Sequence, residues 1–487
     1  MTRHIRFNAF DMNCVAHQSP GLWKHPRDKS WKYKDLDYWQ DLARTLERGI
    51  FDGIFIADVI GYYDVYKGSN YHAIEQAAQI PVNDPIQLAA PIALATEHLG
   101  IGITASTSFE HPYTFARRLA TTDHHTKGRV GWNIVTSYLE SGAKNIGQGG
   151  LKSHDNRYEV ASEYVEVLYK LFEGSWEEGA VIRDAERGIF TDPSKVHEIG
   201  HKGKYFEVPG YHLSEPSPQR TPVLYQAGAS GPGKAFAAAH AECVFVAAPT
   251  KKLLRAYVAD IRQRAAAAGR DPKKVLIYNL TTLIIAETDE KAERLFAEYQ
   301  SFASYDGSLV FMSGWSGIDF GQYAPTDELK KVETNAIVSM VENFGGKDRA
   351  WTVEELAKWG GIGGTGPVFV GSPSTIADIL QEWVEEDRCR RFQPRLCGDA
   401  RQFRGGGRPA RAGTPEAWRL SHGLPAGHPV RQAVRRRPLS PRKPSRPCRS
   451  RHRGHQAPGC RACSGREADV GCVIAQRRVV EFEDICE

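Results

Sequence analysis

Cysteine is scarce over most of the chain. Residues 1–387 contain two cysteines, Cys14 and Cys243, whereas residues 388–487 contain seven. Two thiols in so long a stretch exclude a disulfide-stapled framework and suit a reducing compartment.

Long apolar runs are absent too. No segment approaches the roughly 18 consecutive apolar residues that a membrane-spanning helix needs. The N-terminal MTRHIRFNAF lacks the apolar core of a secretion signal. We therefore expect no membrane span, no signal peptide and a cytoplasmic protein.

The formal charge of +5 conceals two opposite parts. Residues 1–387 carry 40 Lys and Arg against 50 Asp and Glu, a net charge of −10. Residues 388–487 carry 23 against 8, a net charge of +15. The acidic body argues against generic binding to nucleic acid or to an anionic membrane surface.

Short β-rich runs alternate with helix-length amphipathic segments along the body. Seven such pairs predict parallel strands with crossover helices, and their number favours a TIM-type (β/α)8 barrel over an open sheet. Segments 175–220 and 305–372 interrupt the pattern and are expected to be insertions. The expected strands are 4–10, 51–58, 101–106, 128–135, 221–228, 242–248 and 275–288; the expected helices are 35–49, 84–100 with Gly100 as its cap, 112–125, 155–174, 231–241, 251–269 and 289–304.

The composition changes where the eighth unit should follow. A helix at 374–386 should lead into the eighth strand, but residues 388–487 contain 22 Arg and one Lys, with Gly, Pro and Cys throughout. We therefore expect an incomplete barrel over residues 1–387 that has lost its eighth βα unit, and an irregular or disordered tail from 388. Such a barrel would have two unpaired strand edges and poor solubility.

A shifted reading frame is our hypothesis for this change of composition. Each residue fixes most of the first two bases of its codon, so a neighbouring frame is partly determined. Read one base later, residues 388–397 permit Asp-Val-Asp-Gly-Phe-Asn-Leu-Ala-Tyr-Ala, and 398–419 permit a turn and an amphipathic helix. We interpret 388–487 as an out-of-frame translation, caused by a real insertion or deletion or by a sequencing error.

The tail also contains an incomplete zinc-like spacing. Its members are His452, His455, Cys460 and Cys463. The usual pairing of two CxxC motifs, or of CxxC with HxxxH, is absent. We therefore expect no metal site, and no nucleic-acid function for the Arg-rich tail.

Polar residues stand at the ends of several expected strands. Asp58 ends one expected strand, and Thr104, Asn133 and Gln226 lie toward the carboxyl ends of three others; active sites of such barrels lie at the carboxyl ends of the strands. From spacing alone, each is either a strand terminator or capping group, or a ligand contact.

Two further motifs begin helices. In QAGASGPG, Ser230 and the following glycines offer backbone N–H groups and a helix N-terminus to an anion, or a plain helix cap. In HDNRY, His154 and Tyr158 lie four residues apart on one helix face, which suits packing or capping as well as binding.

The loop after the first strand has unusual chemistry for a surface connection. It contains Cys14, His17 and Trp23. A Cys–His nucleophile pair is one interpretation, and a partly apolar pocket wall is the other.

With these residues in view, the chain resembles the bacterial-luciferase-like flavin monooxygenases. The branch is the one containing the nitrilotriacetate, dibenzothiophene-sulfone, dimethyl sulfide and long-chain alkane enzymes. The resemblance covers about residues 3–387. It rests on NAFDMNCVAHQSPGLWKHP, FIADVIGYYDVYKGS, IPVNDP, HPYTFARRLATTDHHTKGRVGWNIVTS, HDNRYEVASEYVEVLYKLFEGSW, DPSKVHEIGHKGKYFEVPG and EPSPQRTPVLYQAGAS.

The resemblance implies an enzyme that uses FMN reduced by a separate NAD(P)H-dependent flavin reductase, with O2 as co-substrate. In this family O2 adds to the flavin to give a C4a-hydroperoxide, which oxygenates the substrate, while the protein orients the cofactor and excludes water. Matching positions imply that Asp58, Thr104, His154, Tyr158 and Ser230 contact FMN, with Ser230 at the phosphate.

For the substrate side the resemblance implies Cys14, His17, Tyr63, Gln79 and Tyr138. These positions are shared with the dimethyl sulfide and long-chain alkane branch. An irregular segment, 305–345, would form part of a lid.

The choice of substrate rests on finer features. Tyr138 and Phe311 stand where the alkane enzyme has His, and GWSGIDF (314–320) and IGGTGPVFVGSP (362–373) are more similar to the sulfide enzyme. We expect dimethyl sulfide or a similar organosulfur substrate, with terminal hydroxylation of a long-chain alkane as the alternative. A second alternative is a non-catalytic flavin-binding barrel, inactivated by the C-terminal change. Relatives form dimers or tetramers, so a homo-oligomer is expected.

Overall fold

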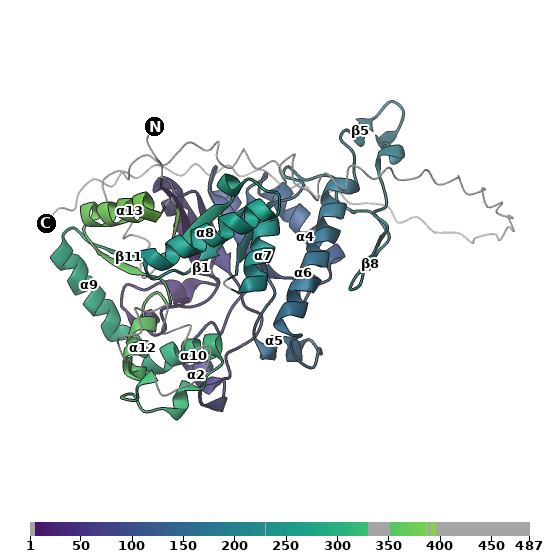
Figure 1. Cartoon of the computed structure of the whole chain (residues 1–487). Helices are drawn as coiled ribbons and strands as arrows, with labels where there is room; N and C mark the ends of the chain where they lie inside the picture. Colours follow the sequence, from purple (N-terminus) through teal and green to yellow (C-terminus); the bar gives the residue numbers. More distant parts are fainter. Residues whose placement is uncertain (1–4, 229, 330–350, 388–390, 396–487) are drawn as a thin grey trace, which may run out of the picture. The chain divides into compact units, whose positions relative to one another are not determined.

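The structure is a computed structural model that describes residues 5–228, 230–329, 351–387 and 391–395. Its centre is a closed ring of parallel strands, each hydrogen-bonded to the next (Figure 1). In spatial order these strands are β1 (Arg6–Met12), β2 (Gly53–Ala57), β3 (Gly100–Ser106), β4 (Val130–Val135), β9 (Val223–Ala227), β10 (Cys243–Val246), β11 (Leu276–Ile285) and β13 (Arg391–Arg395). The expected (β/α)8 barrel is therefore confirmed.

Strand β13 corrects the expectation that the eighth strand is lost. It pairs in parallel with β1, where Phe7 lies opposite Phe392, and with β11, where Asn279 lies opposite Phe392. Because main-chain hydrogen bonds do not depend on side-chain type, neighbouring strands can hold a segment whose composition does not resemble a strand. The two unpaired edges expected for the barrel are thus absent from the described residues, and that reason for poor solubility is wrong.

The position of β13 matches the shifted reading frame. Residues 391–395 are those for which that frame permits Gly-Phe-Asn-Leu-Ala, the strand of the missing unit. The helix that the same frame permits after residue 398, and the zinc-like spacing, lie outside the described residues.

Helices cover the outside of the barrel. Figure 1 shows α7, α8 and α13 along one part of it, and α4 and α6 along another. The covering helices are α1 (Leu36–Arg48), α3 (Ile86–Ala95), α4 (Pro112–His125), α6 (His154–Tyr169), α7 (Gly231–His240), α8 (Lys251–Ala267), α9 (Asp289–Phe302) and α13 (Pro373–Asp387). Helix α3 ends at Ala95, where Thr96 turns to an extended conformation, and Gly100, the expected cap, begins β3 instead.

The apolar core has two layers. One lies between strands and helices, where the side chains of β2, β3 and β4 meet α1, α3, α4 and α6. The other fills the inside of the barrel with aromatic rings, among them Phe55 of β2 and Tyr225, Phe245 and Tyr278 of the neighbouring strands β9, β10 and β11. The rings of Tyr225 and Phe245 stack at 5.3 Å with an interplanar angle of 10°. The barrel is therefore a packed core, and ligands must bind at its ends.

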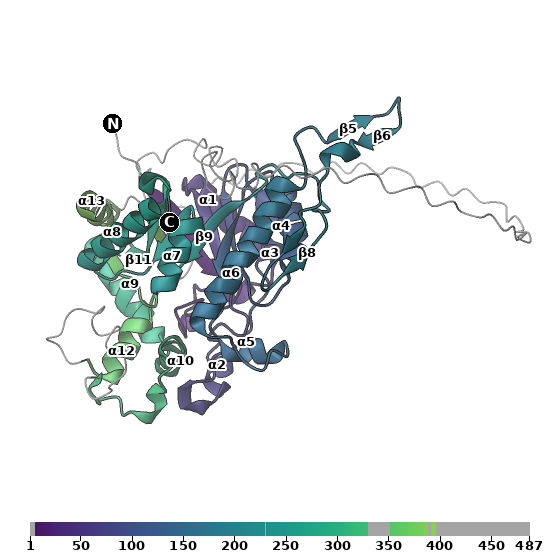
Figure 2. The same cartoon turned by 45° about the vertical axis from the view of Figure 1, so that its right-hand side comes forward.

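The two expected insertions are present. The first carries the hairpins β5 (Val181–Asp184) with β6 (Ile189–Thr191) and β7 (His201–Lys202) with β8 (Glu207–Val208), and β5–β6 projects from the barrel (Figure 2). The second carries α10 (Tyr305–Ser316), α12 (Val353–Gly360) and β12 (Val368–Gly371), which pairs with β11. Residues 305–316 are helical, so the prediction of an irregular segment there is wrong.

Short elements complete the described part of the chain. They are α2 (Tyr71–Glu75), α5 (Glu140–Asn145), the π-turn Lys170–Gly174, and the 3-10 turns Leu22–Lys24, Ser30–Lys32, Tyr66–Gly68, Pro193–Lys195, Pro272–Lys274 and Phe320–Gln322. Across the described ranges, each helix is too short or too polar to cross a lipid bilayer.

Candidate active site

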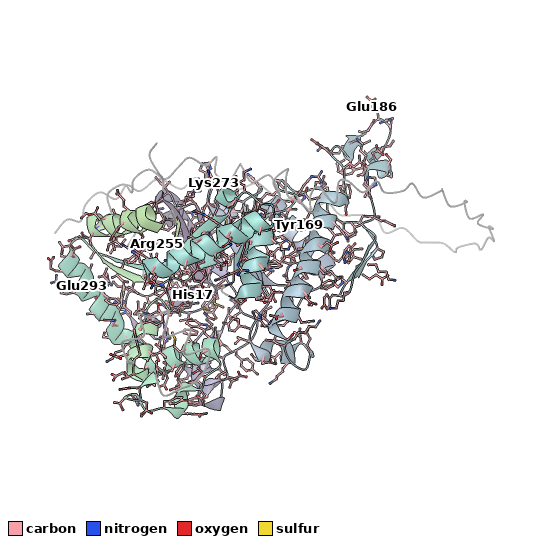
Figure 3. The ribbon with its side chains drawn as sticks, viewed as in Figure 1. His17, Tyr169, Glu186, Arg255, Lys273 and Glu293 are labelled. Carbon is pink, nitrogen blue, oxygen red and sulfur yellow. The ribbon has the colours of Figure 1, made fainter. Side chains whose placement is uncertain are left out.

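The carboxyl ends of the barrel strands face α2, α10 and α12. Figure 3 shows His17, in the loop after β1, on the side of the strands nearer to these helices, with Lys273 on the opposite side. Helix α10 packs against both α2 and α12. The second insertion therefore lies on the side of the barrel to which the carboxyl ends of the strands point.

A hydrogen-bonded cluster lies beneath α10, and we call it the tyrosine cluster: Tyr63, Gln79, Tyr138 and Trp315. The hydroxyl of Tyr63 donates to Gln79 Oε1 at 2.9 Å and lies 2.5 Å from the hydroxyl of Tyr138. The indole Nε1 of Trp315 donates to the same hydroxyl at 3.2 Å. Tyr63 and Gln79 are 2% and 4% exposed, whereas Tyr138 is 46% exposed. Three of the five expected substrate-side residues are thus brought together.

Cys14 and His17 lie in the adjoining loop and are both buried. Burial, and then the nearby Asp11 carboxylate, raises the pKa of the Cys14 thiol well above its usual value. The His17 ring meets Phe10 edge-on at 4.6 Å, and its backbone lies in the left-handed region with φ +39°. A neutral thiol is a poor nucleophile, so this geometry favours the pocket-wall interpretation over a Cys–His pair.

Polar groups also converge at the ends of β2, β3 and β4. Asn133 Nδ2 donates to Thr104 Oγ1 at 3.1 Å, and both residues are buried. Burial, followed by the neighbouring Asp84 carboxylate, raises the pKa of Asp58 from 3.8 to about 7, although Arg118 acts in the opposite direction. A carboxyl group of this kind changes its charge near neutral pH.

Two buried amide oxygens, one on β4 and one on β9, lack a hydrogen-bond partner among the described residues. They are Asn133 Oδ1 and Gln226 Oε1. An unpaired buried oxygen costs about 1–3 kcal/mol, and such groups call for an explanation such as a bound ligand.

The loop after β9 forms a small cradle in front of α7. Ser230 is the N-cap of α7, and its Oγ accepts from Gly233 N at 3.1 Å. A Cβ at Gly233 would lie 2.7 Å from the hydroxyl of Tyr158 and 3.0 Å from Ser230 Oγ. The ring of His154 lies 5.2 Å from that of Tyr158. Glycine therefore leaves room for the hydroxyls of Tyr158 and Ser230 to meet, and both the cap and the anion interpretation of Ser230 stand.

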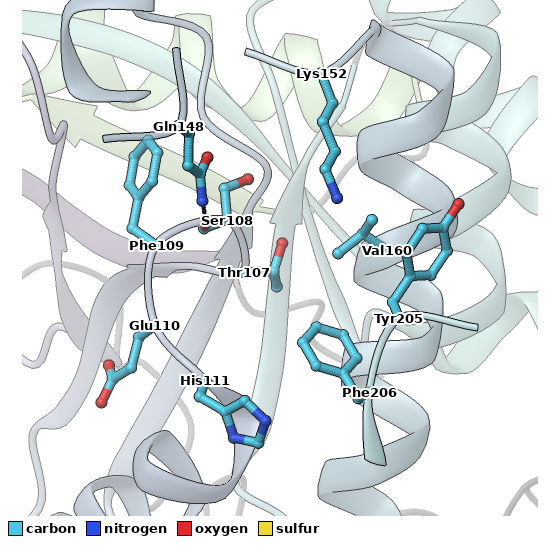
Figure 4. A pocket seen from close by; sticks show the side chains of 10 residues that line it. All are labelled: Thr107, Ser108, Phe109, Glu110, His111, Gln148, Lys152, Val160, Tyr205 and Phe206. Atoms are coloured by element: carbon cyan, nitrogen blue, oxygen red, sulfur yellow. Dashed lines mark hydrogen bonds between the residues drawn. The ribbon is translucent and has the colours of Figure 1, made fainter. Parts of the chain in front are cut away.

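A separate cavity opens between the loop after β3 and the start of α6 (Figure 4). Its volume is about 280 Å³. The Lys152 amine points into it and lies 5.2 Å from the centre of the Tyr205 ring. None of the ten expected site residues lines this cavity, whose walls are Thr107, Ser108, Phe109, Glu110, His111, Gln148, Lys152, Val160, Tyr205 and Phe206.

Trp315 was missed by the sequence reasoning. It lies four residues after Phe311 on α10, and the two rings stack at 5.3 Å with an interplanar angle of 7°. This i, i+4 aromatic pair was the available signal, but its sequence distance from Tyr63 concealed the contact.

A parallel barrel with buried polar groups at its carboxyl ends defines an enzyme-like site, and comparison with known proteins identifies the class. Residues 9–387 match the family model described as luciferase-like monooxygenase. The chain belongs to this family.

Two relatives of known activity are similar to this chain over most of their length. The dimethyl-sulfide monooxygenase of Hyphomicrobium sulfonivorans is 50% identical over 388 residues, covering 79% of this chain and 81% of that protein. The long-chain alkane monooxygenase of Geobacillus thermodenitrificans (strain NG80-2) is 47% identical over 386 residues, covering 79% and 84%.

Solved structures agree with the fold. The crystal structure of DmoA from Hyphomicrobium sulfonivorans superposes with a TM-score of 0.82 at 44% identity, covering 90% of this chain and all of that one. A riboflavin lyase solved with modified FMN and riboflavin gives a TM-score of 0.77 at 31% identity, covering 89% and 99%.

Proposed function

We propose that this chain is the oxygenase of a two-component system, which uses FMN reduced by a separate NAD(P)H-dependent flavin reductase. It would insert one oxygen atom of O2 into a small apolar substrate. The observation that carries the proposal is the cradle of Tyr158, Ser230 and Gly233 beside the unpartnered amide oxygen of Gln226. Reduced FMN would supply the reaction with O2, which amino-acid side chains do not provide.

The cradle suits the phosphate of FMN. The Ser230 oxygen already accepts from Gly233 N, so its own proton is left to donate. The Tyr158 hydroxyl lies on the same side of Gly233 as the Ser230 oxygen, 2.7 Å from the position that a Cβ would take. The N-terminus of α7 adds backbone N–H groups and the positive end of a helix dipole.

The strand ends suit the flavin ring. Asp58, Thr104 and Asn133 lie at the ends of β2, β3 and β4, where the buried amide oxygen of Asn133 can accept from a ring N–H. His154, on the exposed side of Tyr158, would border the ribityl-phosphate end. This arrangement would fix the ring against the barrel mouth and leave its other face to the substrate.

The tyrosine cluster suits an apolar substrate. The rings of Tyr63, Phe311 and Trp315 pack together in one apolar cluster, and Cys14 and His17 are buried as well. Such surroundings exclude water and bind through apolar contact. We propose dimethyl sulfide or a similar organosulfur compound as the preferred substrate, supported by the 50% identity to a dimethyl-sulfide enzyme. A long-chain alkane is the alternative, supported by the 47% relative.

The test is a coupled assay. The purified chain is supplied with FMN, NADH and a flavin reductase, and dimethyl sulfide, alkanes and sulfones are screened for substrate-dependent NADH oxidation and for product. We expect turnover of dimethyl sulfide at roughly 1 s⁻¹ or faster. The variant Gly233→Ala tests the cradle. Its added Cβ would crowd the cradle and should weaken flavin binding, while the tyrosine cluster stays unchanged. Flavin binding without product from any candidate would contradict the proposal and favour a non-catalytic flavin-binding barrel.

A further inference from the structure

The indole of Trp315 makes a directed contact with the tyrosine cluster. Its Nε1 lies 3.2 Å from the Tyr63 hydroxyl. An indole N–H can only donate, so the Tyr63 oxygen must accept there whatever the other partners do. The direction of this hydrogen bond is therefore fixed by chemistry.

The Tyr63 hydroxyl is fully used. It can donate one hydrogen bond and accept two. It donates to Gln79 Oε1 and accepts from Trp315, so the contact at 2.5 Å with Tyr138 is left for the second acceptance. Burial raises the pKa of Tyr63 well above its usual value, so the hydroxyl stays neutral and the pattern persists across ordinary pH.

Packing holds the indole in place. A Cβ at Gly314 would overlap the Tyr63 ring, so the ring lies directly against the backbone of α10. The Phe311 ring meets Tyr63 at 5.4 Å with an interplanar angle of 84° and stacks on Trp315. Helix α10 therefore grips Tyr63 by its ring and by its hydroxyl.

We propose that Trp315 is a positioning residue for the substrate side of the site and acts through Tyr63. Its N–H occupies one acceptor position of the Tyr63 oxygen, while Gln79 Oε1, which can only accept, takes the Tyr63 proton and leaves the other acceptor position to Tyr138. In this way it joins α10 to the loops that carry residues 63, 79 and 138. The expected effect on catalysis rests on the proposed function. The coupling between Trp315 and Tyr63 does not depend on it.

The test is a double-mutant cycle. Trp315→Phe keeps a ring to stack on Phe311 and removes the donor, whereas Tyr63→Phe keeps the ring on α10 and removes the acceptor. Both single variants, the double variant and the wild type are measured in two ways: by the urea midpoint of unfolding without flavin, and by kcat and KM in the coupled assay. Trp383→Phe, a buried tryptophan of α13 that packs on Phe369, is the matched control.

We expect Trp315→Phe to lower the urea midpoint in the wild type, because a hydrogen bond is lost. In the Tyr63→Phe background the indole N–H already lacks its acceptor, so removing it should leave the midpoint unchanged or raise it. In the assay we expect about a tenfold loss of kcat/KM, mostly through KM, from Trp315→Phe in the wild type alone. The affinity for FMN should not change. Equal losses in both backgrounds would mean that Trp315 acts only by packing and would overturn the proposal.

The two measurements separate the two proposals. If no substrate is turned over, the proposed function fails, while the unfolding cycle still decides whether Trp315 and Tyr63 are coupled. If the cycle is additive while dimethyl sulfide is oxidised, the role of Trp315 fails and the proposed function stands.

Discussion

Asp58, at the end of β2, is a carboxyl group with a raised pKa. Its carboxyl group is largely buried and faces a second carboxylate, Asp84, so the charged form is disfavoured and its pKa rises to about 7. A carboxyl group with a raised pKa at the end of a barrel strand is a candidate functional group. The consequence can be measured without knowing the substrate.

We expect Asp58 to make folding pH-dependent. Between pH 3.8 and about 7 the folded chain holds this proton and the unfolded chain does not, so stability falls as the pH rises through this window and is level above it. Asp58→Asn should therefore stabilise the protein at pH 8 by about 4 kcal/mol, and by only about 1 kcal/mol at pH 4.5. Thermal unfolding of both proteins at the two pH values, without flavin, measures the difference.

The control for this prediction is Glu293→Gln. Glu293 is exposed on α9, and the same change of charge there should shift unfolding by little at either pH. A stability gain from Asp58→Asn of the same size at pH 4.5 and pH 8 would show that the Asp58 carboxyl is not the titrating group.

At the scale of the elements, helices with an apolar stripe and a defined start could be predicted from the sequence. Helix α4 occupies residues 112–125 as expected, because Pro112 stands in its first turn and its apolar residues recur on one face. Helix α10 could not be predicted in this way. Residues 307–313 are buried without interruption, so no alternation between apolar and polar faces marks the helix.

Strand β13 was missed for a different reason. Its sequence, RFQPR, contains one large apolar residue, Phe392, beside two arginines, a glutamine and a proline, and lacks the apolar run of a buried parallel strand. It is a strand because β1 and β11 leave a gap whose main-chain groups need partners. The neighbouring strands therefore determine this strand, and the sequence of residues 391–395 alone does not predict it.

Pro394 makes a prediction about this strand. It lies in the middle of β13, opposite Thr281 of β11, and proline has no N–H to give to either neighbour. We expect Pro394→Leu to raise the free energy of unfolding by about 1 kcal/mol or more, because a main-chain hydrogen bond is restored. Urea unfolding measures the change.

Arg395→Leu is the matched control for Pro394→Leu. It adds an apolar side chain to the same strand without restoring a backbone donor. If both variants shift the midpoint equally, side-chain burial and not the missing N–H limits the stability of β13.

At the scale of the whole molecule, the site could be predicted in part. Parallel strands bring their carboxyl ends together, so the convergence of Asp58, Thr104 and Asn133 followed from the βα order. The contact between Trp315 and Tyr63 did not, because 252 residues separate them and only the packing of α10 on the barrel joins them.

The C-terminal hundred residues carry the last prediction. We propose that they are an out-of-frame translation, and resequencing the DNA around codon 387 should reveal one inserted or deleted base relative to close relatives. Restoring the frame should give a protein that is more soluble and more active than the present chain in the coupled assay. An intact frame, or equal solubility and activity of the two proteins, would contradict this.

The pairing of β1 with β13 has a consequence for how the barrel is made. Phe7 leaves the ribosome early and Phe392 leaves it late, yet the two lie side by side in the finished ring. During synthesis β1 and β11 each have one unpaired edge until residues 391–395 are made. Contacts between residues so far apart in the sequence form slowly. The growing chain therefore passes through a state with two open strand edges, which can pair with other chains until residues 391–395 close the ring.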